Sequence, residues 1–290
     1  MTAAPSWLAD FLAAEQLPAS YADTVDRVVL PLAEQVARAR HPLIVGVCGT
    51  QASGKSTLVA ALGGLLEAKG LRTALLSIDD LYLTREERQD LARRIHPLLT
   101  TRGPPGTHDV ELGLETLDGL LRAGPVALPR FDKARDTRRP PSDWDSVLGP
   151  VDVVLFEGWC VGARPQPAAA LAEPVNALER DEDPDGRWRR FVNEALAGPY
   201  QALFRRVDLL VMLKAPGFEV VLDWRIEQER KLKARLAAAG AGPALTMGDA
   251  AIARFIAHYE RLTRHILAEM PGRADVVVEL DEDRRARLAV

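Results

Sequence analysis

The sequence predicts an α/β fold: a doubly wound, mainly parallel sheet flanked by helices and preceded by a helical extension. Two observations support this prediction. Five short runs are apolar on both faces, as strands inside a parallel sheet are, and helical patterns separate each run from the next. The alternation of strand and helix is the repeating unit of such a sheet. The predicted strands cover residues 43–48, 73–78, 151–156, 207–213 and 275–280.

The predicted helices carry apolar residues three or four positions apart. They lie before the first strand (residues 6–40), directly after it (56–69), and from about residue 248 to the Pro-Gly pair at 271–272. Thr246 and Asp249 resemble a capping box at the start of the last helix.

Chain length and composition bear on domain organisation. At about 150 residues per domain, 290 residues allow two domains. No sharp break in composition and no internal repeat divides the chain, so we predict one domain over residues 1–290. Residues 1–40 form its helical N-terminal extension, and residues 41–290 form the core with lid and insert loops. The segments 100–108 and 162–186 are predicted to be rich in loops.

The overall composition excludes several classes of protein. Hydrophobic residues make up 47% of the chain and charged residues 27%, which excludes a disordered, collagen-like or disulfide-stapled chain. A net charge of −4 offers no general basic field for nucleic acid or an anionic membrane.

The cysteines and the longest apolar stretches bear on compartment. Cys48 and Cys160 are far apart in sequence, so we expect both to be buried, reduced and free of metal. No apolar stretch approaches the length of a membrane span, and the first 18 residues lack a basic segment, so we expect the cytoplasm.

A phosphate-binding motif follows the first predicted strand. Residues 49–56 match G-x-x-x-x-G-K-S/T between a buried strand and a helix, the context that a P-loop requires. Backbone N–H groups and the helix N-terminus would bind the phosphates of a nucleotide, Lys55 would reach the outer phosphates, and Ser56 would hold Mg²⁺. The predicted nucleotide-binding residues are Gly49, Thr50, Gln51, Ala52, Ser53, Gly54, Lys55, Ser56 and Thr57.

Glu157 is the predicted second element of the phosphate site. It follows the buried run 151–156 and precedes Gly158, which lets the chain turn close to a ligand. A carboxylate there can orient a water on Mg²⁺, so we assign Ser56 and Glu157 to the metal. The alternative is a solvated acid at a strand end.

Two neighbouring carboxylates end the second predicted strand. Asp79 and Asp80 lie at the carboxyl edge of the sheet, where open α/β proteins bind ligands. A kinase needs a group that accepts the proton of the acceptor hydroxyl, and hydrolysis does not, so we predict Asp79 as this base. Asp80 is the alternative base, or holds magnesium through water. The third option, for either aspartate, is a purely structural role as a cap of the local backbone.

Cationic side chains gather in two loops that follow. Arg102 and His108 lie in the first, and Lys133 and Arg138 lie in the second. A guanidinium matches a carboxylate with two parallel hydrogen bonds, so a small acidic acceptor is expected. Lys133 is the stronger candidate because lysine is scarce in this chain. Arginine is abundant throughout the chain, so the alternative for each loop arginine is that it has no role in binding the acceptor. His108 is either a hydrogen-bonding residue of the loop or a hydrogen-bond donor to the substrate, and it lacks the neighbours of a metal ligand.

A charged helix is expected from Trp224 to Lys231. One interpretation is that its charged residues form a solvent-exposed face, on which Glu227 and Lys231, four residues apart, make an ion pair. The other is that the helix belongs to a lid over the active site. In kinases of this type an arginine of the lid stabilises charge on the transferred phosphoryl group, and Arg225 is our candidate.

Together these residues resemble the plant- and fungal-type glycerate kinases and their bacterial relatives, within the P-loop kinase group of uridine kinases, pantothenate kinases and phosphoribulokinase. The resemblance spans most of the chain and rests on residues 49–57, 77–84, 105–109, 131–133, 156–159 and 224–229, with 176–179 and 188–189 in an insert. Leu81 stands where the family more often has Phe, and Ala52 replaces a frequent Gly.

The resemblance implies that ATP with Mg²⁺ phosphorylates a hydroxyl of D-glycerate to 3-phosphoglycerate. The catalytic residues would be Lys55, Asp79, Glu157 and Arg225, and the substrate-binding residues Asp80, Tyr82, Arg102, His108, Asp109, Lys133 and Arg138. The partner would be a small hydroxy acid, with no nucleic acid or membrane and no indication of oligomeric state.

Two other functions are weighed against this one. The first is a P-loop kinase for a nucleoside, a pantothenate-like compound or a sugar phosphate. The second is a nucleotide-hydrolysing switch or chaperone protein. Against the switch, no N-K-x-D motif follows the run 207–213, and the run 151–156 leads into Glu-Gly rather than the D-x-x-G of GTPases.

Overall fold

A six-stranded sheet forms the centre of the protein in a computed structural model that describes residues 6–238 and 246–289. Its strand order is β10-β9-β8-β1-β7-β2, and only β10 runs antiparallel to its neighbour. The prediction of a mainly parallel sheet is therefore confirmed, and all five predicted strands are present. The strands are β1 (Leu43–Gly49), β2 (Thr73–Ser77), β7 (Val153–Gly158), β8 (Leu209–Lys214), β9 (Val276–Leu280) and β10 (Ala286–Leu288).

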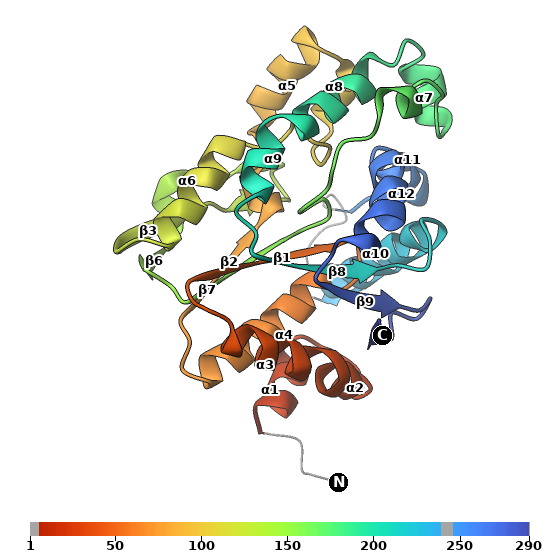
Figure 1. Ribbon diagram of the computed structural model, residues 1–290. Helices are drawn as coiled ribbons and strands as arrows, with labels where there is room; N and C mark the ends of the chain where they lie inside the picture. Colours follow the sequence, from red (N-terminus) through yellow and green to blue (C-terminus); the bar gives the residue numbers. More distant parts are fainter. Residues whose placement is uncertain (1–5, 239–245, 290) are drawn as a thin grey trace.

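Helices cover both faces of the sheet because its strands are apolar on both sides (Figure 1). On β1, Val45 and Val47 face one hydrophobic core while Ile44 and Cys48 face the other. The first core is completed by α4 and by the helical segment before β1. These helices are α1 (Ser6–Ala14), α2 (Tyr21–Thr24), a π-helical turn (Val25–Val29), α3 (Leu30–Arg38) and α4 (Lys55–Ala68).

The N-terminal helices supply part of this core. Val28, Leu32 and Val36 are fully buried and pack in the same cluster as β1 and α4. Residues 1–5 of the predicted extension lie outside the described part of the chain.

The opposite face is covered by helices from the middle and the end of the chain (Figure 1). The helix predicted from residue 248 to 271 is two helices, because His258 and Tyr259 interrupt it. Its predicted capping box is wrong, since Gly248 rather than Thr246 is the N-cap of α11. The helices of this part are α6 (Val110–Leu120), α8 (Arg187–Ala197), α9 (Pro199–Phe204), α11 (Asp249–Ala257) and α12 (Glu260–Glu269).

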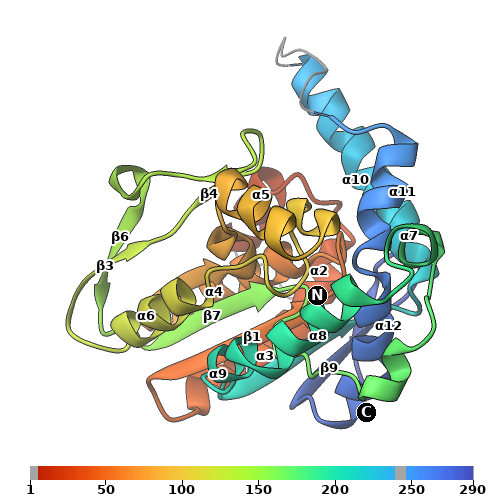
Figure 2. The ribbon, with the colours of Figure 1, turned by 90° about the horizontal axis from the view of Figure 1, so that it is seen from above.

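Two short antiparallel hairpins were not predicted. The pair β3 (Gly124–Leu128) and β6 (Asp145–Gly149) extends beside α6, away from the main sheet (Figure 2). The pair β4 (Phe131–Asp132) and β5 (Thr137–Arg138) lies between them in sequence and frames the turn that carries Lys133. Most of these strand residues are exposed or half-buried, so they lack the continuous apolar run that identified the central strands.

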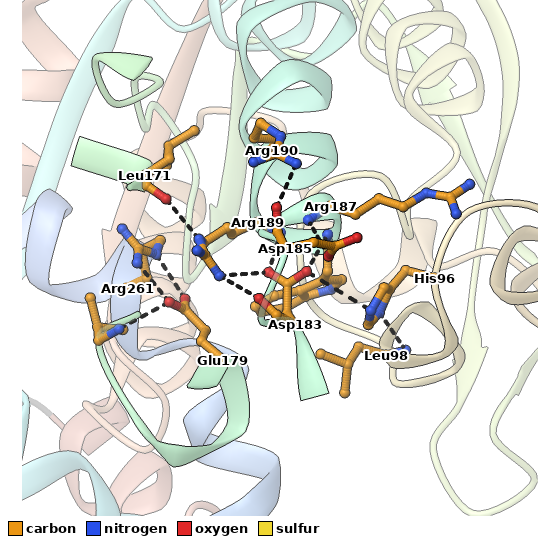
Figure 3. Close-up of polar contacts among 12 residues, drawn as sticks. His96, Leu98, Leu171, Glu179, Asp183, Asp185, Arg187, Arg189, Arg190 and Arg261 are labelled. Atoms are coloured by element: carbon orange, nitrogen blue, oxygen red, sulfur yellow. Dashed lines mark hydrogen bonds and ion pairs between the residues drawn. The ribbon is translucent and has the colours of Figure 1, made fainter. Parts of the chain in front are cut away.

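The segment predicted as loop-rich contains a helix, α7 (Ala177–Glu182), held by buried ion pairs (Figure 3). Arg261 binds both carboxylate oxygens of Glu179 at 2.6 and 2.7 Å. Arg189 contacts Asp183 at 3.1 Å, and Asp183 also accepts the N–H of Trp188 at 2.7 Å. The four charged side chains are buried. Because a buried charge that loses its partner is costly, these pairs fix the insert against α8 and α12.

Candidate active site

The phosphate loop connects β1 to α4 with backbone conformations that small residues permit. Gly54, the N-cap of α4, has φ of 90°, in the left-handed region. Ala52 has φ of 58°, also in the left-handed region, which glycine adopts more readily than alanine. A Cβ on Gly49 would approach Leu213 Cβ to 2.9 Å. The loop therefore curls tightly against the end of the sheet.

Buried polar groups in this loop fit a polyanion. Thr50 Oγ1, Ser53 Oγ and both polar atoms of the Gln51 side chain are buried and make no hydrogen bond within the described residues. The Lys55 ammonium donates to the carbonyl of Thr50 at 2.9 Å. Unpaired buried donors are unusual in proteins, and phosphate oxygens would satisfy them at the N-terminus of α4.

Ser56 and Glu157 meet at the position predicted for magnesium. The Ser56 hydroxyl donates to Glu157 Oε1 at 3.0 Å, and Glu157 is only 7% exposed. In the sheet, Glu157 lies opposite Val47 of β1 on one side and Ser77 of β2 on the other. A hydroxyl and a carboxylate are the hard oxygen donors that Mg²⁺ prefers, so the pair fits this ion.

Asp79 lies in a turn directly after β2, next to the strand that carries Glu157. Its Oδ1 accepts the hydroxyl of Tyr82 at 2.8 Å, and its Oδ2 accepts the ammonium of Lys133 at 2.8 Å. Desolvation would raise the pKa of Asp79, but the charge of Lys133 and these two hydrogen bonds outweigh it and hold the pKa well below its usual range. Asp79 is therefore ionised.

Asp80 has a different set of contacts. Its Oδ1 accepts the N–H of Phe131 at 3.0 Å, and its Oδ2 lies 3.5 Å from Arg130. Burial raises the pKa of Asp80, while the Phe131 N–H and Arg130 lower it in part. These contacts fasten the start of β4 beside the turn after β2. They favour the structural interpretation of Asp80 over its alternatives as base or magnesium ligand, and its predicted binding of substrate stays a prediction.

Each predicted acceptor cation has a carboxylate partner within the protein. Lys133 pairs with Asp79, Arg138 contacts Asp109 at 2.9 Å, and Arg102 pairs with Asp136. The side chain of Lys133 is 64% exposed, compared with 25% for Arg102 and 16% for Arg138. Lys133 is thus the most accessible of the three. Asp109 has a second role, because it caps α6 by accepting the N–H of Leu112 at 3.0 Å.

Arg88 and Asp136 also belong to the network of ion pairs around the candidate site, although neither was predicted from the sequence. Arg88, on α5 (Arg85–Arg94), is 1% exposed and binds the side chain of Asp136 at 2.8 Å. It also donates to the carbonyls of Leu83 and Thr100 at 3.3 and 2.6 Å. Arg88 therefore joins the turn between β4 and β5 to the two loops around Asp79. An arginine in a charged helix gives no sequence signal of this burial.

His108 and Tyr82 form the wall beside Asp79. Their rings stack with centroids 4.5 Å apart. Burial lowers the pKa of His108 to about 3, so its imidazole is neutral. The hydroxyl of Tyr200 accepts the N–H of Gly106 at 2.9 Å and is hydrogen-bonded to His108 Nδ1 at 2.5 Å. Tyr200 was not predicted, because one tyrosine in an apolar helix resembles any core residue.

The remaining predictions have mixed outcomes. Arg225 lies on α10 (Glu219–Ala238) and pairs with Glu229 at 2.8 Å on the same helix, so its role in a lid stays a prediction.

Cys48 and Cys160 are both buried and free of disulfide bonds, as predicted. Among the helices of the described residues, none is both long and apolar enough to cross a membrane.

The fold and the site together define a P-loop protein equipped for phosphoryl transfer. A phosphate loop follows β1, a carboxylate on β7 reaches its serine, and an ionised aspartate follows β2 at the same edge of the sheet. This edge is where parallel α/β sheets bind nucleotides.

Comparison with known proteins identifies the family. The chain is 33% identical to the uncharacterized kinase mug58 of Schizosaccharomyces pombe, over 81% of this chain and 84% of that protein. It is 31% identical to chloroplastic D-glycerate 3-kinase of Arabidopsis thaliana over 86% of this chain, but this match spans only 54% of the plant protein. The solved D-glycerate 3-kinase of Cryptococcus neoformans superposes with a TM-score of 0.72 at 26% identity, covering 94% of this chain and 100% of that one.

The chain therefore belongs to the family of P-loop kinases that includes the D-glycerate 3-kinases. The family model for the methylmalonyl Co-A mutase-associated GTPase MeaB also matches residues 16–82. That match covers the phosphate loop and its flanks, less than half of the chain, and does not reach Lys133 or Glu157.

Proposed function

We propose that this kinase transfers the γ-phosphoryl group of ATP, with Mg²⁺, to a hydroxyl of D-glycerate and forms 3-phosphoglycerate. The observation that carries the proposal is the contact between Asp79 and Lys133 at the edge of the sheet beside the phosphate loop. A hydroxy acid needs a base for its hydroxyl and a cation for its carboxylate, and this pair supplies both. The relatives named D-glycerate 3-kinase support this choice of acceptor.

The position of each residue supports the role that we propose for it. The loop amides and Lys55 bind the phosphates of ATP, and Ser56 and Glu157 hold Mg²⁺, which neutralises charge on the phosphates. Asp79 accepts the proton of the acceptor hydroxyl as its oxygen attacks the γ-phosphorus. Tyr82 orients Asp79 from the opposite side.

An acceptor panel tests the proposal. The protein is supplied with Mg²⁺ and either ATP or GTP, and with D-glycerate, L-glycerate, uridine, pantothenate or ribulose 5-phosphate. ADP or GDP and the phosphorylated product are both measured. We expect phosphorylation of D-glycerate from ATP. Phosphorylation of another acceptor in its place refutes the assignment of substrate but leaves the kinase assignment intact.

A nucleotide-hydrolysing switch is the second candidate, favoured by the match of the MeaB family model to residues 16–82. In the same panel, release of nucleoside diphosphate that no acceptor accelerates would support the switch. Asp79 is the observation against it, because hydrolysis does not require a base for an alcohol.

We further propose a cytoplasmic enzyme whose partner is a small hydroxy acid rather than nucleic acid or membrane. The net charge of −4 supports this proposal. The Arabidopsis relative is named as chloroplastic, so fractionation of the native cells is the direct test of the compartment.

A further inference from the structure

Each carboxylate oxygen of the proposed base already accepts a hydrogen bond in this structure. Tyr82 occupies Oδ1 of Asp79 and Lys133 occupies Oδ2, each at 2.8 Å. A carboxylate that accepts two hydrogen bonds, one of them from a cation, has little affinity for a further proton. Asp79 therefore becomes a stronger acceptor for the proton of an alcohol when the cation among these partners leaves.

Lys133 is the partner that can leave. Its side chain is 64% exposed, whereas Tyr82 is 3% exposed and stacked on His108. Because the ammonium of Lys133 is exposed, a second anion reaches it from solvent and competes with Asp79 without displacing the protein around the pair. Removing the Tyr82 hydroxyl would instead require repacking of the wall beside Asp79.

The backbone that carries Lys133 is held in place. Asp136, three residues later, binds buried Arg88 and also Arg102. The start of the turn is fastened as well, because Phe131 donates its N–H to Asp80 at 3.0 Å. The flexible side chain of Lys133 can therefore exchange partners while the backbone of the turn stays in place.

We propose that the carboxylate of the acceptor takes Lys133 from Asp79, so that binding of the substrate itself releases the base. This proposal rests on the proposed function. With the acceptor bound, Lys133 pairs with its carboxylate and Oδ2 of Asp79 faces its hydroxyl. The hydroxyl proton then passes to Oδ2 while the hydroxyl oxygen bonds to the γ-phosphorus. The bond from that phosphorus to the bridging oxygen breaks, and ADP leaves with the electron pair.

The exchange makes an acceptor without a carboxylate a poor substrate because of slow turnover as well as weak binding. The test compares D-glycerate with its neutral amide, D-glyceramide, in the wild type and in Lys133→Met. Arg135→Met is the matched control, since Arg135 lies in the same turn with a side chain 83% exposed. The kcat and KM of each acceptor are measured, and thermal unfolding with and without ATP confirms that each variant is folded.

In Lys133→Met we expect the KM for D-glycerate to rise by about 10- to 100-fold, because one charged hydrogen bond is lost. We expect kcat with D-glyceramide to increase at least about threefold over the wild type, because the base is no longer occupied. Arg135→Met should change neither value. A residue that only binds substrate would leave turnover of the neutral amide unchanged, and a merely structural residue would lower turnover of both acceptors.

Two further outcomes of this experiment distinguish a failure of the partner exchange from a failure of the proposed function. If the wild type phosphorylates D-glycerate and Lys133→Met shows no gain with D-glyceramide, the exchange is wrong and the proposed function stands. If the wild type phosphorylates no carboxylate-bearing acceptor, the proposed function fails and the exchange fails with it.

Discussion

Replacing Asp79 by asparagine tests the assignment of the base. The amide keeps an oxygen for the Tyr82 hydroxyl but cannot take a proton, and it loses the ion pair with Lys133. General-base catalysis contributes about 100- to 10,000-fold, so we expect kcat to fall by that factor, about 2.7 to 5.4 kcal/mol in activation free energy. Steady-state kinetics of product formation measures the loss. ATP affinity should stay within about twofold, because the phosphates are bound by the loop after β1.

Asp80→Asn is the matched control for this prediction. Its amide oxygen can still accept the Phe131 N–H, so we expect kcat to fall by less than about tenfold. A larger loss in Asp80→Asn than in Asp79→Asn would refute our choice between the two acids. A loss confined to ATP binding in Asp79→Asn would assign that residue to the nucleotide or its metal.

Three further predictions concern the nucleotide site and the insert. Lys55→Ala should lower kcat at least about 100-fold, because one charge beside the transferred group is lost, and near-normal turnover would refute the phosphate site. Glu157→Gln should raise the Mg²⁺ concentration for half-maximal rate about 10- to 100-fold in a magnesium titration, and an unchanged requirement would remove Glu157 from the metal. Asp183→Ala should lower the unfolding free energy by about 3 to 5 kcal/mol, since it removes the carboxylate that pairs with the buried charge of Arg189. Asp181→Ala, at an exposed position of the same acidic run, should change it by less than about 0.5 kcal/mol in the same denaturant titration.

The central sheet could be predicted because its strands are buried on both faces. Continuous apolar runs carry that burial in the sequence, and each predicted strand lies within two residues of its observed bounds. The β3–β6 hairpin and the break before α12 left no such signal. The hairpin has few buried residues, so it lacks a continuous apolar run. At the break, the hydroxyl of Tyr259 lies 3.0 Å from the carbonyl of Arg102, a contact between residues that are far apart in sequence.

For the site, the sequence alone determined the phosphate loop, Glu157 and the aspartates after β2, because each is read from a motif or from its position at a strand end. The tertiary structure decided how Asp79 and Asp80 differ: the partners that distinguish them, Lys133 and Phe131, come from a hairpin about 50 residues later. It also decided that Arg88 is buried and that Arg102 and Arg138 are already paired. Charge and hydrogen bonding act through space, so only the folded chain determines which of many arginines and carboxylates meet.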